Sequence, residues 1–152
     1  MHAIDLIRDK LAGHPEINYS ATESSVRIPP RSPEGFECAF YAHLHGFTVH
    51  FEGWHEEFQS ESEALNCFAF GLSDTCRLKV SSIGARDHSW TLQSLHDGEW
   101  HDESTTALLL VPFWRAKEVR YLLNSYLKAV GALGDGASGG PTTPSHTASP
   151  PP

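Results

Sequence analysis

The sequence predicts an α+β fold in which helices pack on one face of a mainly antiparallel sheet. Two patterns support this prediction. Apolar residues recur at helical spacing in residues 3–12 and again in residues 60–72, whereas apolar and polar residues alternate through residues 36–51. Strands that are joined by short turns pair antiparallel, and the turns in this chain are short.

The chain begins with a predicted amphipathic helix over residues 3–12, which His14-Pro15 is expected to end. The apolar face of this helix consists of Ile4, Ile7 and Leu11. A short strand is expected next, around Val26 and Ile28.

Residues 36–51 are predicted to form a β-hairpin with His45-Gly46 as its two-residue turn. This register pairs Phe40 with Phe51, Ala42 with Val49, and Leu44 with Phe47. All six side chains then fall on one face, and a slip of one residue would move them to the other. The opposite face would carry Tyr41, His43, His45, Thr48, His50 and Glu52.

Residues Gly53 to Gln59 are expected to connect this hairpin to a second helix. Ser60 and Glu63 form a capping box at the start of that helix, and Gly71 stands where it should end. The predicted apolar face consists of Ala64, Leu65, Phe68 and Leu72.

The second half of the chain is predicted to contain about three strands and a last helix. The strands lie around Leu78 and Val80, on both sides of an Asp97-Gly98 turn, and over residues 105–111, which are apolar enough for a central, covered strand. Arg115 to Val130 is predicted as a helix with a basic face.

The predicted order is therefore helix, three strands, helix, about three strands, helix. This order resembles that of the small acidic chaperones of bacterial type III secretion and of related regulatory domains. The resemblance covers residues 3–130 and lies in element order alone, so no site residue is carried over from it.

Residues 1–130 are expected to form a single α+β domain, followed by a disordered tail over residues 131–152 that is rich in Gly, Ser, Thr and Pro. No apolar run approaches the ~20 residues that span a bilayer, and no secretory signal is apparent. The three cysteines lack a metal-binding spacing, and Cys38 is expected in the core. A cytoplasmic protein with reduced thiols is predicted.

Charge is distributed very unevenly along the chain. Between Ser32 and Cys76 there are eight acids and no Lys or Arg, so this acidic block carries the whole net charge of −8. Such a block attracts cationic partners and disfavours nucleic acid. The histidines within it are expected to favour the protonated form.

Catalytic and metal sites are only weakly indicated. An HxH pair with a further histidine and a carboxylate could bind zinc, and the candidates are His43, His45, His50 and Glu52. His55 with Glu56 or Glu57 could act as a general base, although no nucleophile is marked nearby. We therefore predict no catalytic residue, no tightly bound metal and no cofactor.

The sequence favours a non-enzymatic protein-binding or regulatory module, such as a secretion chaperone, an adaptor or an immunity protein. It would receive a basic or amphipathic segment of a partner protein, without nucleic acid or membrane. The predicted partner-binding residues are Tyr41, Glu52, Trp54, Glu56, Glu57, Glu61 and Glu63. Two alternatives stay open: a ligand- or metal-binding domain or enzyme that uses the histidine face, and an oligomerisation domain or homodimer with Trp114 at its interface.

Overall fold

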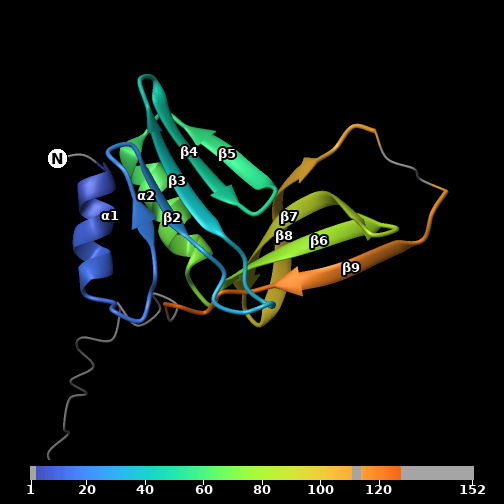
Figure 1. The fold of residues 1–152 in the computed structure, drawn as a ribbon. Coiled ribbons are helices and arrows are strands. Elements are labelled where there is room, and N and C mark those ends of the chain that lie inside the picture. Colours follow the sequence, from blue (N-terminus) through green and yellow to red (C-terminus); the bar gives the residue numbers. More distant parts are fainter. Residues whose placement is uncertain (1–2, 111–113, 128–152) are drawn as a thin grey trace, which may run out of the picture.

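The part of the chain that the structure describes folds into two helices and two antiparallel sheets, which confirms the predicted α+β class (Figure 1). The computed structural model describes residues 3–110 and 114–127. Its elements are α1 (Ala3–Ala12), β1 (Ser20–Ala21), β2 (Ser25–Ile28), β3 (Cys38–His43), β4 (Gly46–Phe51), β5 (Trp54–Phe58), α2 (Glu61–Gly71), β6 (Cys76–Ile83), β7 (Arg86–His96), β8 (Glu99–Ala107) and β9 (Lys117–Leu122). The predicted element order therefore matches only roughly.

The first sheet has the strand order β1-β2-β3-β4-β5, and α1 and α2 pack on its apolar face. Phe40 of β3 meets Phe68 of α2 edge-on, with 5.7 Å between ring centroids. Gly71 ends α2 against the ring of Phe51, where a Cβ atom would lie only 2.2 Å from a ring carbon. The face that carries the histidines is left open by the helices.

The hairpin of β3 and β4 forms as predicted, but Leu44-His45 rather than His45-Gly46 makes its turn. Each residue is therefore paired two positions away from the prediction, and Phe40 lies opposite Val49. A shift of two residues leaves every strand side chain on its predicted face, because side-chain direction repeats every two residues. Leu44 itself lies in the turn and is 90% exposed, so its predicted burial is wrong.

The segment predicted as a connection, Gly53 to Gln59, instead contains β5, which pairs antiparallel with β4. Glu52 adopts a positive φ of 52° in the turn between the two strands. Trp54 then points into the core, where it is 1% exposed and stacks on Phe51 at a centroid distance of 5.1 Å.

The second sheet has the strand order β8-β7-β6-β9. Asp97-Gly98 forms the predicted turn between β7 and β8, with φ values of 52° and 77°. Two positive φ values suit the twist of a two-residue hairpin, and Asp-Gly adopts them readily. Strand β6 lies inside this sheet, and its core-facing side chains Cys76, Leu78 and Val80 are fully buried.

Two predictions for the second half of the chain are wrong. The described part of the segment predicted as a central strand, residues 105–110, is not one, because β8 is an edge strand that ends at Ala107, and Leu109 and Leu110 beyond it are 98% and 94% exposed. Arg115 to Val130 is not a helix in its described part, residues 115–127. It contains β9, which pairs antiparallel with β6.

The two sheets meet where β5 approaches β7 and β8. The indole N–H of Trp54 donates a hydrogen bond to Ser104 Oγ at 2.9 Å. Trp90 of β7 lies against Gly53, where a Cβ atom would come within 2.2 Å of the indole ring. Glycine is therefore required at this contact between the two sheets.

The chain returns from β9 to the first sheet through residues 123–127. Asn124 is buried, and its Oδ1 accepts the backbone N–H of Phe36 at 2.9 Å. Its Nδ2 donates to Gly71 O at 3.3 Å and to Cys38 Sγ at 3.2 Å. The side chain of Asn124 thus connects α2 to the first sheet and satisfies buried backbone groups.

All three cysteines are free thiols. Cys38 and Cys76 are fully buried, as expected for Cys38, and Cys67 is partly buried in α2. Burial raises the pKa of the Cys67 thiol to about 12 and raises the pKa values of Cys38 and Cys76 strongly as well.

In the described part of the chain, no helix has both the length and the apolar character needed to cross a membrane. The predicted tail over residues 131–152 lies outside the described residues.

Candidate protein-binding surfaces

The open face of the first sheet carries a continuous line of ring side chains. Tyr41 stacks on His43 at a centroid distance of 6.5 Å and meets His50 edge-on at 5.3 Å. His50 in turn stacks on His55 of β5 at 5.3 Å. His43 Nε2 also forms a hydrogen bond with Thr48 Oγ1 at 2.7 Å. The line includes His55 because β5 is a strand rather than the predicted loop.

The local environment of His50 opposes protonation. Burial lowers the pKa of His50, and the neighbouring His55 lowers it further, although Glu37 acts in the other direction. The sequence led us to expect that the acidic block would favour protonated histidines. For His50 that expectation is wrong, because desolvation outweighs the attraction of the nearby carboxylate.

The four candidate metal ligands are not brought together. His45 lies in the β3–β4 turn, whereas Glu52 lies at the opposite end of β4, where its carboxylate accepts the backbone N–H of Glu37 at 2.9 Å. Within residues 3–110 and 114–127, no three His, Cys, Asp or Glu side chains are grouped so that they could hold a metal ion. A small pocket of about 200 Å³ beside the turn is lined by His43, His45, Gly46, Phe47, Thr48, Glu57, Phe58 and Gln59.

The predicted partner-binding residues lie on different surfaces. Tyr41 and Glu57 share a cross-strand row on the open face, since both align with Thr48. Glu56 is directed to the other side of β5, next to Cys67, whose pKa it helps to raise. Trp54 is a core residue in the structure and contributes to no surface.

The acids Glu61 and Glu63 lie in the first turn of α2, where negative charge complements the helix dipole. The predicted cap is confirmed, because Ser60 Oγ accepts the backbone N–H of Glu63 at 3.4 Å. These two acids flank Ser62, which lines a groove between the helices.

A mostly apolar groove, which we call the helix groove, lies on the described part of the chain. It has a volume of about 700 Å³ and lies between α1 and α2. Its lining is mostly apolar and consists of Leu6, Ile7, Lys10, Leu11, His14, Ile17, Ser62, Leu65, Asn66, Phe68, Ala69, Leu72 and Leu127. The polar lining residues come from both helices or from the residues just after α1. The groove therefore combines an apolar surface with hydrogen-bonding groups on both sides.

The sequence alone does not predict this groove. Leu65 belongs to the predicted apolar face of α2, and it is partly buried against the core and also lines the groove. The sequence of α1 does indicate an additional apolar surface. Leu6 lies next to Ile7 and makes the apolar face of the helix wider than the three residues that pack on the sheet would require.

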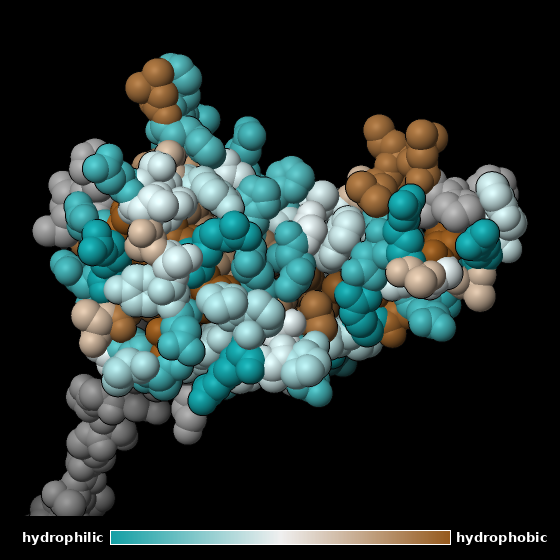
Figure 2. Space-filling view, in the orientation of Figure 1, coloured by the Kyte–Doolittle hydropathy of each residue, from teal (hydrophilic) through white to brown (hydrophobic). Residues whose placement is uncertain are grey.

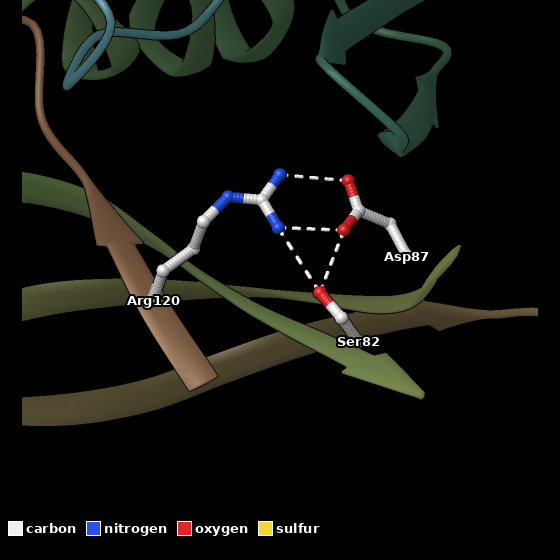
Figure 3. A network of polar contacts seen from close by, with 3 residues as sticks. All are labelled: Ser82, Asp87 and Arg120. Atoms are coloured by element: carbon white, nitrogen blue, oxygen red, sulfur yellow. Dashed lines mark hydrogen bonds and ion pairs between the residues drawn. The ribbon is translucent and has the colours of Figure 1, made fainter. Parts of the chain in front are cut away.

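A polar network fastens β9 to the hairpin of β6 and β7 (Figure 3). The guanidinium of Arg120 donates to both carboxylate oxygens of Asp87, at 2.6 and 2.7 Å, and to Ser82 Oγ at 3.1 Å. Ser82 Oγ donates to Asp87 at 2.8 Å. The hydrogen bonds from Arg120 lower the pKa of Asp87, as expected for a bidentate pair.

Comparisons of the chain with protein-family models, with curated proteins and with solved structures gave no significant match.

Proposed function

We propose that this chain is a non-enzymatic protein-binding module that holds an amphipathic segment of a partner protein in the helix groove between α1 and α2. The observation that carries the proposal is the apolar lining of that groove, to which both helices contribute. Apolar grooves between helices commonly accept the apolar face of an amphipathic helix.

Acidic side chains at one end of the helix groove favour a bound segment that is basic at that end. Glu61 and Glu63 stand beside Ser62 at one end of the helix groove, so a cation on the segment would meet negative charge there. On the α1 side, Lys10 and His14 also line the groove. The segment that fits is therefore amphipathic, with its basic residues near the start of α2.

The first experiment blocks the groove. Ala69 lines it and is exposed on α2, so Ala69→Trp should fill the groove without disturbing the core. Peptides selected from a phage-displayed library on the wild-type protein should show apolar residues at helical spacing and should lose binding to this variant. Ala12→Trp is the matched control, since Ala12 is an exposed helical alanine outside the groove lining, and it should bind as the wild type does.

A second experiment distinguishes the acids at the start of α2 from those of β5. Glu61→Gln with Glu63→Gln should slow association with the selected basic peptides and weaken its dependence on salt. Glu56→Gln with Glu57→Gln removes the same charge from β5 and should have little effect. The reverse result, or selected peptides that bind the Ala69→Trp variant unchanged, would move the interface to the sheet and contradict the proposal.

A further inference from the structure

A cluster of exposed leucines projects from the second sheet where β8 ends. Ala107 is the last residue of β8 paired with β7, and the backbone N–H of Leu108 still donates to His88 O at 2.8 Å. Leu108 is 49% exposed, while Leu109 and Leu110 are almost fully exposed. Figure 2 shows the resulting apolar cluster standing out from the molecular outline above the second sheet.

Cationic side chains lie at the same end of this sheet. Arg86 and Lys117 both align with Ile83, from the strands on either side of β6. Arg115 approaches the β6–β7 turn, since a Cβ atom at Gly84 would lie 3.5 Å from its guanidinium. The three cations are exposed.

The acids at this end only partly offset these cations. Asp87 is engaged by Arg120 through two hydrogen bonds, and Glu118 balances one further positive charge. Most acids of the acidic block lie in the first sheet and α2, whereas this end of the second sheet points away from α1 (Figure 1). Glu52 of the block does approach the second sheet, where it helps to raise the pKa of Arg120. Exposed charges that lie more than about 8 Å apart are largely screened at physiological salt.

The shape of the leucine cluster fits a lipid interface better than it fits the surface of a partner protein. Leu109 and Leu110 project from a connection between strands, so a protein partner would need a matching pocket, whereas a lipid interface accommodates protruding apolar side chains without one. Basic residues next to such side chains add attraction to anionic headgroups.

We propose that this leucine tip, formed by Leu108, Leu109 and Leu110 with Arg86, Arg115 and Lys117, is a peripheral contact site for anionic lipid membranes. The leucines enter the apolar side of the interface, and the cations face the headgroups. The sequence led us to expect no membrane partner because no apolar run could span a bilayer. A peripheral contact requires no such run, and with so few apolar side chains it is weak and reversible.

The test is sedimentation of the full chain with lipid vesicles. The wild-type protein should sediment with vesicles of phosphatidylcholine and phosphatidylserine, less with phosphatidylcholine alone, and less again as salt is added. Leu109→Asp with Leu110→Asp should weaken binding on the order of tenfold or more, because it replaces inserting apolar groups with charge. Arg115→Gln with Lys117→Gln should weaken binding only to the anionic vesicles.

Leu44→Asp is the matched control, because Leu44 is also exposed, at 90%, but lies in the β3–β4 turn of the other sheet, and this variant should bind as the wild type does. Failure of the wild-type protein to sediment with anionic vesicles would overturn the proposal, as would unchanged binding of the double leucine variant. Self-association in the absence of vesicles that the same variant abolishes would identify the tip as a contact between copies of this chain, and would also overturn it.

Discussion

At the scale of single residues, the core of the first sheet is built around Phe51. Its ring meets Phe36 edge-on at 5.5 Å, stacks on Trp54 and lies against the bare Cα of Gly71. A ring held on three sides leaves a cavity when it is removed, since neighbours with few alternative positions cannot collapse into the space.

Phe51→Ala is therefore expected to lower the free energy of unfolding by about 3–5 kcal/mol. Leu44→Ala removes an apolar side chain from the same hairpin, but at an exposed turn position, and should change it by less than about 0.5 kcal/mol. Urea denaturation of the two variants measures both. A small loss for Phe51→Ala would contradict the packing described here.

The lowered pKa of His50 makes stability depend on pH. A histidine whose pKa is lower in the folded than in the unfolded state binds fewer protons when folded, so stability rises with pH through that range. The loss of stability should begin as pH falls below the ordinary histidine value of 6.5, and it should be complete below the folded pKa of His50.

This sign can be checked by NMR titration. The His50 ring should titrate below 6.5, and His55→Gln should raise its pKa by removing a neighbouring positive charge. His50→Gln should flatten the pH dependence of stability below 6.5. A His50 midpoint above 6.5 would show that the acidic block dominates instead.

At the scale of elements, the sequence predicted face patterns better than pairing partners. Alternation in β3 and β4 identifies the buried face, but it repeats every two residues and so cannot distinguish registers that differ by two. That choice depended on the turn, where we preferred the glycine of His45-Gly46. In the structure Gly46 begins β4 with a φ of 154° next to Phe58 O, so the glycine serves close strand approach rather than the turn.

Strands β1, β5 and β9 were not predicted from the sequence, and β5 and β9 were missed for different physical reasons. Strand β5 contains His55, Glu56 and Glu57, which have weak strand preference, and it is held by pairing with β4 and by Trp54 in the core. Strand β9 has apolar residues that also fit a helical period, and its choice of conformation comes from pairing with β6, far away in sequence. Pairing with a neighbouring strand and burial of a side chain in the core depend on tertiary structure, so neither can be recognised from the local sequence of β5 or β9.

The candidate surfaces were predictable only in part. The sequence placed Tyr41, His43 and His50 on one face, and this is confirmed, but it could not place Glu56 and Glu57 on opposite sides of a strand that it did not predict. The helix groove depends on how α1 sits relative to α2, which is a matter of tertiary packing.

The pair of Arg120 with Asp87 should help to fix β9 against β6. Both side chains are substantially exposed, so solvent screening limits their coupling to about 0.5–1 kcal/mol even with bidentate geometry. A double-mutant cycle with Asp87→Asn and Arg120→Met measures this coupling by urea denaturation. The exposed pair of Arg27 with Glu37, joined by one contact of 2.7 Å, is the comparison and should couple less.

At the scale of the whole molecule, the two sheets are linked by several contacts between their side chains and backbone. Trp54 reaches Ser104, Trp90 covers Gly53, and Asn124 returns from β9 to α2. Because both sheets contribute to one core cluster, we expect a single cooperative unfolding transition.

Deletion of residues 131–152 should leave the thermal midpoint of this transition nearly unchanged, because their Gly, Ser, Thr and Pro content offers little apolar area for packing. Differential scanning calorimetry of the full chain and of residues 1–130 makes the comparison. A fall of many degrees on deletion would show that the tail packs on the domain.

The three buried or partly buried cysteines allow local unfolding of this protein to be followed by their chemical modification. Alkylating reagents attack the thiolate, and burial both hides Cys38 and Cys76 and keeps them protonated at neutral pH. Their modification therefore has to wait for a fluctuation that admits solvent. Cys67 in α2 is less buried and should react first. The alkylation rates of the three cysteines therefore report how often α2 and each of the two sheets open locally.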